Sequence, residues 1–191
     1  MSEAIVIKQN TKKNIFYVAG TLVMSILFLW MVFLDCRPKT GILGVLCQSA
    51  VFYILLKILF VVGALFCVYG AIYMMKRIKS GKAVLIVDQT GVTDNSSAAA
   101  LGFIPWADID RIYMDSMMNN QFIELVLKDE EKYLAKMSGY KKFTALSNKK
   151  LGHQIVCITL NFTGVSPQSV FLKMQLLFQQ AKKKENQPNA Q

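Results

Sequence analysis

One apolar run without a single charge, residues 15–34, constrains this chain more than any other feature. It reads IFYVAGTLVMSILFLWMVFL, and its only polar side chains carry hydroxyl groups. At about 1.5 Å per residue, a helix of this length covers the roughly 30 Å hydrocarbon core of a bilayer. A buried helix of a soluble protein is usually shorter or has a polar stripe. The run therefore predicts a membrane-spanning helix at residues 15–34.

A second apolar run occupies residues 51–75 and is interrupted only by Lys57. A lysine near the end of a span extends its ammonium group to the interface, so we expect the second span to cover residues 52–75. Neither run contains an acidic partner for Lys57, which makes an ion pathway a poor interpretation. The first run is too long for a signal-peptide core and no Ala-x-Ala pattern follows it, so we expect a retained anchor.

Basic residues flank both runs and explain much of the net charge of +10, so we expect no nucleic-acid partner. The basic residues before the first run are Lys8, Lys12 and Lys13, and those after the second are Lys76, Arg77, Lys79 and Lys82. The positive-inside rule places both clusters in the cytoplasm. We therefore expect a bacterial inner-membrane protein with both termini cytoplasmic, a cytoplasmic segment 1–14 and an external loop 35–51. The second cluster is also placed to face lipid headgroups.

The four cysteines include no Cys-x-x-Cys pair, and there is one histidine, so metal-ligand spacing is absent and we expect no metal or cofactor. Cys36 and Cys47 both fall in the expected external loop. An oxidising compartment would permit a disulfide between them, but the sequence leaves the geometry of this short loop open. Both the bonded and the free state remain possible at this level.

The pattern changes to period two after Gly81, which predicts short strands. The expected strands lie at residues 83–88, 92–94, 102–106, 111–114, 122–128 and 155–160. Ser166 and Pro167 then predict a helix N-terminus, and an apolar stripe continues to about Lys183. We expect an α+β domain of antiparallel strands with a C-terminal helix at residues 76–183, and a disordered tail at residues 184–191.

Two motifs in this domain carry a resemblance to a known family. They are VDQTGV at residues 87–92 and FIPWADI at residues 103–109, followed by Ile112. Together they resemble the pattern D-x-x-G-[IV] … [IF]-x-W-x-D-I-x-x-I of small, largely uncharacterised bacterial membrane proteins with two spans and a pleckstrin-homology-like (PH-like) domain. The resemblance implies a membrane hairpin followed by a partly open barrel that the C-terminal helix caps.

The motif positions are structural: Asp88, Gly91, Trp106, Asp108 and Ile109. We expect Gly91 to permit the first hairpin turn through its free φ angle. Trp106 is expected to fill the mouth of the barrel. Asp108 is expected to cap the turn into the strand that begins at Ile109.

No nucleotide-binding or nucleophile motif is present, and the only histidine, His153, is expected at a surface or sheet edge. Without a nucleophile–base pair we expect no enzyme. The leading hypothesis is a non-enzymatic membrane protein whose PH-like domain binds an unknown protein partner. A second is the sensing of anionic lipid by six lysines, Lys79, Lys82, Lys141, Lys142, Lys149 and Lys150. A third, implied by analogy with membrane proteins of similar layout, is an immunity protein that protects against an antibacterial toxin.

Overall fold

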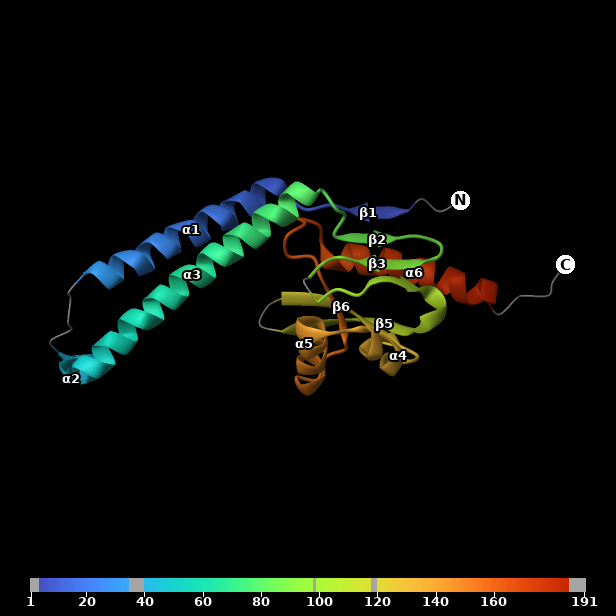
Figure 1. Ribbon diagram of the computed structural model, residues 1–191. Coiled ribbons are helices and arrows are strands. Elements are labelled where there is room, and N and C mark those ends of the chain that lie inside the picture. The colour runs from blue at the N-terminus through green and yellow to red at the C-terminus, as the bar shows by residue number, and fades with distance from the viewer. Residues whose placement is uncertain (1–3, 35–39, 98, 118–119, 186–191) are drawn as a thin grey trace. The chain divides into compact units, whose positions relative to one another are not determined.

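The computed structural model describes residues 4–34, 40–97, 99–117 and 120–185. The chain divides into two compact units, which Figure 1 shows in one ribbon. One unit is Thr11–Ser80, and the other joins Met1–Asn10 to Gly81–Gln191. The second unit therefore contains sequence from both sides of the first.

Two long apolar helices dominate the first unit, α1 (Thr11–Phe33) and α3 (Ala50–Ser80). They contain 23 and 31 residues, and both are long and apolar enough to cross a membrane. This confirms the two apolar helices that the sequence predicts. A short helix, α2 (Gly41–Gln48), lies within the segment expected as a loop. Its sequence, GILGVLCQ, is apolar except for its last residue, and a short apolar run of this kind does not by itself predict a helix.

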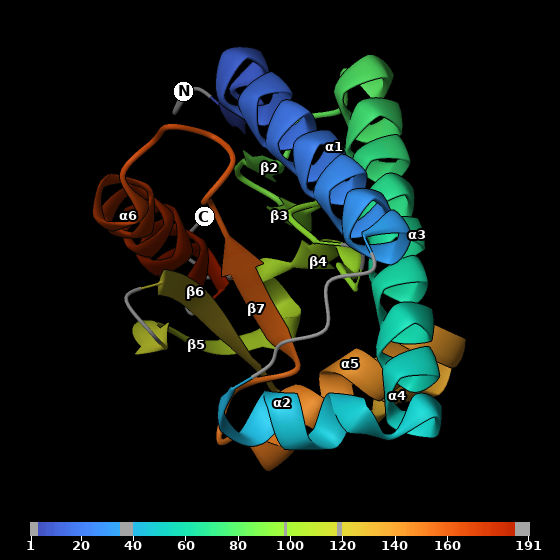
Figure 2. The same cartoon turned by 90° about the vertical axis from the view of Figure 1, so that its left-hand side faces the viewer.

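α1 and α3 run side by side in both ribbon views (Figures 1 and 2). Ser25 donates a hydrogen bond to the backbone oxygen of Ala64 at 3.3 Å, so the two backbones come close at this level. Because Gly63 has no side chain, the ring of Phe28 packs closely against the backbone of α3. A Cβ atom on Gly63 would lie only 3.3 Å from that ring. Small residues and a hydroxyl group at the contact are typical of helix pairs in membranes. Lys57 places its ammonium group 4.9 Å from the ring centre of Tyr53.

The second unit contains a four-stranded antiparallel sheet with the order β1-β2-β3-β4. Its strands are β1 (Ile5–Ile7), β2 (Leu85–Val87), β3 (Gly91–Asp94) and β4 (Gly102–Pro105). β1 comes from residues 1–14, which we expected to be a separate segment. Three paired positions, from Ile5 opposite Val87 to Ile7 opposite Leu85, join it to β2. The strand that precedes the apolar helices in sequence thus pairs with the strand that follows them.

The remaining described strands form a three-stranded antiparallel sheet with the order β5-β6-β7. Its members are β5 (Ile109–Met117), β6 (Asn120–Leu127) and β7 (Val156–Thr159), with the short 3₁₀ turn η1 (Trp106–Asp108) before β5. The helices of this unit are α4 (Glu130–Lys136), α5 (Gly139–Lys150) and α6 (Pro167–Glu185). The described strands form two separate sheets and no closed barrel. Antiparallel strands with a C-terminal helix are as predicted.

α6 covers the core of this unit with one apolar stripe. The stripe buries Val170, Met174, Leu177 and Phe178, as its 3.6-residue spacing predicts. Beneath it lie fully buried aliphatic side chains from both sheets: Leu85, Val87, Val92, Ile104, Ile109, Ile123, Leu125 and Ile158. One continuous core therefore joins the two sheets and α6.

Candidate functional site

The motif residues Asp88 and Gly91 form the turn between β2 and β3. One carboxylate oxygen of Asp88 accepts hydrogen bonds from the backbone and the hydroxyl of Thr90, at 2.7 and 2.6 Å, and from the backbone of Gly91 at 3.1 Å. The hydroxyl contact is the main reason that the pKa of Asp88 lies below its usual value. The backbone N–H groups of Thr90 and Gly91 are thus satisfied by the side chain of Asp88 and not by a neighbouring strand, and this stabilises the turn.

Gly91 was expected to be needed for its free φ angle, but the structure gives a different reason, the close approach of a neighbouring strand. It is not among the glycines with positive φ. Instead, a Cβ atom there would lie 2.2 Å from the backbone oxygen of Ile104 and 2.8 Å from the Cα of Pro105. Glycine is needed because β4 approaches the backbone of β3 at this point.

Trp106 is buried, with its ring centre 5.7 Å from that of Phe178 and its indole N–H donating to the backbone oxygen of Asp88 at 2.9 Å. The barrel mouth that it was expected to fill is not formed, because the described strands make two separate sheets. Asp108, expected to cap the turn before Ile109, accepts hydrogen bonds from Tyr133 and Lys132 of α4 instead, at 2.6 and 2.9 Å. The contact with Tyr133, followed by that with Lys132, lowers the pKa of Asp108. The contacts of the motif residues therefore connect β2, η1, α4 and α6.

Within the described residues, the basic cluster after the second apolar run and the cysteine pair do not come together in a site. Lys76, Lys79 and Lys82 are exposed, and Arg77 is half-buried. Cys47 is buried in α2, whereas Cys36 lies outside the described residues. A disulfide between Cys36 and Cys47 therefore stays a prediction, as does the free state of the pair.

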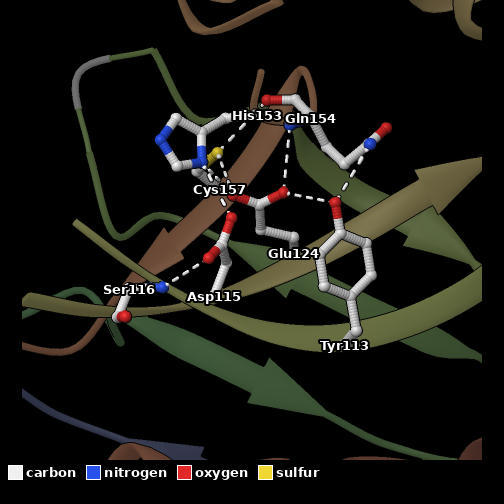
Figure 3. A network of polar contacts seen from close by, with 7 residues as sticks. All are labelled: Tyr113, Asp115, Ser116, Glu124, His153, Gln154 and Cys157. Atoms are coloured by element: carbon white, nitrogen blue, oxygen red, sulfur yellow. Dashed lines mark hydrogen bonds and ion pairs between the residues drawn. The ribbon is translucent and has the colours of Figure 1, made fainter. Parts of the chain in front are cut away.

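A polar cluster that the sequence analysis did not identify lies on one face of the β5-β6-β7 sheet (Figure 3). Its centre is Glu124 in β6, whose side chain has no solvent exposure. The strand register places Tyr113 of β5 and Cys157 of β7 directly opposite Glu124. Directly paired residues of antiparallel strands share a face, and Asp115 joins them because it lies two residues after Tyr113.

Both oxygens of Glu124 have partners. Oε2 accepts hydrogen bonds from the hydroxyl of Tyr113 at 2.7 Å and from the backbone N–H of Gln154 at 3.1 Å. Oε1 lies 2.7 Å from Nδ1 of His153, and the thiol of Cys157 approaches the same oxygen at 3.6 Å. The fully buried carboxylate is thus satisfied by polar groups from both neighbouring strands and from the residues just before β7.

Asp115 is the second carboxylate of the cluster. Its Oδ2 lies 3.2 Å from the same Nδ1 atom of His153, and its Oδ1 accepts a hydrogen bond from the backbone N–H of Ser116 at 2.7 Å. One imidazole nitrogen is therefore shared between two carboxylates. The other ring nitrogen of His153 points away from them (Figure 3).

Burial changes the acidity of the neutral members of this cluster. It raises the pKa of the Cys157 thiol to about 12, and the adjacent Glu124 carboxylate adds to the rise. Burial and the hydrogen bond to Glu124 likewise raise the pKa of Tyr113. Both side chains consequently stay protonated near neutral pH and act as donors.

A cavity of about 200 Å³ borders the cluster. His153 and Cys157 are part of its wall, together with Phe122 of β6 and with Thr144 and Asn148 of α5. The sequence analysis expected His153 at a surface or a sheet edge. In the structure its ring lies instead between two carboxylates and the cavity. The one sequence signal for this arrangement was a glutamate in the middle of the apolar strand FIELVL.

A second candidate site is the surface of α5 together with the residue that follows the helix. Two of its aromatic side chains, Tyr140 and Phe143, are 67% and 70% exposed, and Leu151 just after the helix is 66% exposed. Four lysines lie on the same short segment: Lys141, Lys142, Lys149 and Lys150. We call these seven residues the α5 surface. Large exposed aromatic rings are uncommon on a surface that stays in water, so this one is a candidate contact.

Comparison of the chain with protein-family models, with curated proteins and with solved structures finds no match.

Proposed function

We propose that this is a non-enzymatic, membrane-anchored protein whose soluble unit, a PH-like domain, binds the anionic surface of the membrane that holds its two apolar helices. The observation that carries the proposal is the composition of the α5 surface: exposed aromatic rings interleaved with lysines on one helix.

The chemistry of the α5 surface suits a membrane interface. Aromatic rings such as those of Tyr140 and Phe143 are favoured at the level of the headgroups, where an apolar body meets water. Each lysine near an anionic leaflet contributes roughly 1 kcal/mol of attraction. Lys142 and Lys150 make no polar contact within the described part of the chain, so their charges are available to phosphate groups.

Tethering makes a weak interaction sufficient. If α1 and α3 span the bilayer, the pairing of β1 with β2 requires that the sequences on both sides of the hairpin lie on the same side of it. The basic residues that flank the hairpin favour the cytoplasmic side of a bacterial inner membrane. The domain is then held near lipid at a high effective concentration, and binding becomes an intramolecular event.

Hydrogen exchange of the full-length protein in lipid nanodiscs tests this function. We expect the amides of α5 to exchange more slowly in nanodiscs with anionic lipid than in zwitterionic ones, and the difference to shrink at high salt. The double variant Lys142→Ala/Lys150→Ala should lose most of this difference. The matched control is Lys173→Ala/Lys183→Ala, which removes two exposed lysines from α6 and should behave like the wild type. Equal exchange of α5 in both lipids would refute the proposal.

A protein partner is the second candidate, and a different surface favours it. Leu172 and Leu176 are one turn apart on the outer side of α6 and are 60% and 59% exposed. An amphipathic helix or strand of a partner could cover them. Photo-crosslinking in cells with a probe at position 172 and, separately, at position 143 separates the two functions. A single protein captured at 172 supports the partner, whereas lipid captured at 143 supports membrane docking.

A further inference from the structure

We propose that Asp115, Glu124 and His153 bind one divalent cation of the first transition row, for which Zn²⁺ is the natural probe. This site is independent of the membrane-docking function proposed above. It lies on the β5-β6-β7 sheet, and its three donor atoms are Oδ2 of Asp115, Oε1 of Glu124 and Nδ1 of His153 (Figure 3).

The donor atoms already converge. Nδ1 of His153 lies 2.7 Å from Oε1 of Glu124 and 3.2 Å from Oδ2 of Asp115, and all three atoms lie within 4.8 Å of one another. Nitrogen and oxygen ligands at about 2.0–2.2 Å from a tetrahedral Zn²⁺ stand roughly 3.3 Å apart. To admit the ion, Nδ1 of His153 and Oε1 of Glu124 must move about 0.6 Å apart, while the 3.2 Å between Nδ1 and Oδ2 of Asp115 is already close to the required spacing.

Each carboxylate is oriented by hydrogen bonds to the oxygen that does not face His153. Tyr113 and the backbone of Gln154 hold Oε2 of Glu124, and the backbone of Ser116 holds Oδ1 of Asp115. The remaining oxygens are the two that face His153. Hydrogen bonds that fix the outer atoms of ligands are the usual surroundings of metal sites and set the direction of the ligand atoms.

The charges of the cluster favour a cation. Within the described residues, the ion pairs of Asp115 and Glu124 are with His153 alone, without lysine or arginine. A protonated imidazole would leave one net negative charge beside a carboxylate that is completely buried. A divalent cation bound by two carboxylates and a neutral imidazole brings the total to zero, which removes the cost of burying an unbalanced charge.

Donor type and access narrow the class of cation. Mg²⁺ and Ca²⁺ prefer six or more oxygen ligands, whereas an imidazole nitrogen with two carboxylates suits zinc and its neighbours in the first transition row. The cavity of about 200 Å³ whose wall includes His153 and Cys157 borders the cluster and gives a path for the ion. A water would complete the four ligands of the ion.

The test is calorimetric titration of Zn²⁺ into the metal-stripped full-length protein in detergent, purified through a tag without histidine. We expect one equivalent to bind, and Asp115→Asn to weaken the affinity by about tenfold or more. Asparagine keeps an oxygen that can accept from the backbone of Ser116, so this hydrogen bond within β5 is retained. The matched control is Asp110→Asn, which removes another carboxylate from the same strand and should bind Zn²⁺ like the wild type.

Thermal unfolding is the second measurement, because a ligand that binds only the folded state raises the unfolding temperature. Zn²⁺ should raise it for the wild type and for Asp110→Asn but not for Asp115→Asn or His153→Gln. If Asp115→Asn does not fold, His153→Gln takes its place in the titration. Binding of less than one equivalent to the wild type, or equal affinity in Asp115→Asn and Asp110→Asn, would overturn the proposal.

Discussion

Two carboxylates of the second unit, residues 1–10 and 81–191, have similar partners and opposite surroundings. Asp108 accepts a hydrogen bond from the hydroxyl of Tyr133 at 2.6 Å and from the ammonium group of Lys132 at 2.9 Å, and its side chain is 27% exposed. Glu124 accepts from the hydroxyl of Tyr113 at 2.7 Å, contacts His153 at 2.7 Å and has no exposure.

The difference lies in how the charge is balanced. Asp108 has a permanent cation beside it and water around it, so the pair is complete and connects η1 to α4. Glu124 shares one imidazole with Asp115 and has no permanent cation among its described partners. A hydrogen bond between a carboxylate and a tyrosine therefore does not by itself indicate a binding site. A buried carboxylate whose charge is not fully balanced is a better candidate for binding a ligand.

The largest effect should follow from Glu124→Ala. This change leaves Tyr113, His153 and the backbone N–H of Gln154 without their common acceptor inside the protein, and we expect a loss of about 3–5 kcal/mol of unfolding free energy. Urea unfolding in detergent measures it. A Trp30→Phe background leaves Trp106 as the single tryptophan, so that fluorescence reports on the second unit.

Glu124→Gln is the control for that substitution. It keeps an oxygen for Tyr113 and the shape of the side chain but removes the charge, so its cost should be clearly smaller. Equal stability of Glu124→Ala and the wild type would show that the burial of this carboxylate has no energetic consequence, and the contrast with Asp108 would fail.

Gly91→Ala tests whether the motif around Asp108 depends on backbone packing more than on its carboxylates. The added Cβ would lie 2.2 Å from the backbone oxygen of Ile104, so β3 and β4 must separate. We expect a loss of about 1–3 kcal/mol, as for other overpacked sites. The same urea titration measures it, and a change below about 0.5 kcal/mol would show that β4 moves away easily.

The features that the sequence could predict are those with local causes. Twenty uncharged residues already imply a long helix, and Ser166 with Pro167 and a 3.6-residue stripe imply α6. β1 could not be found in this way because it has three residues and its partner β2 follows both apolar helices. The pairing is a tertiary fact that no short pattern contains.

The cluster around Glu124 was missed for a related reason. Its members come from β5, β6, β7 and the residues before β7, so that no spacing along the chain joins them. Only the register of the sheet brings Tyr113, Glu124 and Cys157 into line. The motif of Asp88, Gly91 and Trp106 was recognisable because its residues act across one turn and its neighbouring strands, but the exact role of Gly91 needed the position of β4.

A moderate effect is expected from Asp108→Asn. The variant keeps an acceptor for Tyr133 but loses the charge that attracts Lys132, which should cost about 1 kcal/mol at neutral pH. The pKa of Asp108 is lowered in the folded state, so its contribution is present above the unfolded pKa of about 3.9 and is lost as the pH falls through the folded value. Unfolding free energies of both proteins should therefore differ at pH 7 and converge at strongly acidic pH. A difference that grows on acidification would contradict this.

The smallest effect should come from Asp110→Asn, which completes a series in order of exposure. The Asp110 side chain is 48% exposed and its Oδ2 lies 3.3 Å from Nε of the neighbouring Arg111, itself 77% exposed. Water solvates both groups with or without the contact, so we expect less than about 0.5 kcal/mol in the same urea titration. A loss as large as that of Asp108→Asn would mean that the bulge between Ile109 and Arg111 depends on this carboxylate. The order Glu124, Asp108, Asp110 would then reflect strand geometry and not burial.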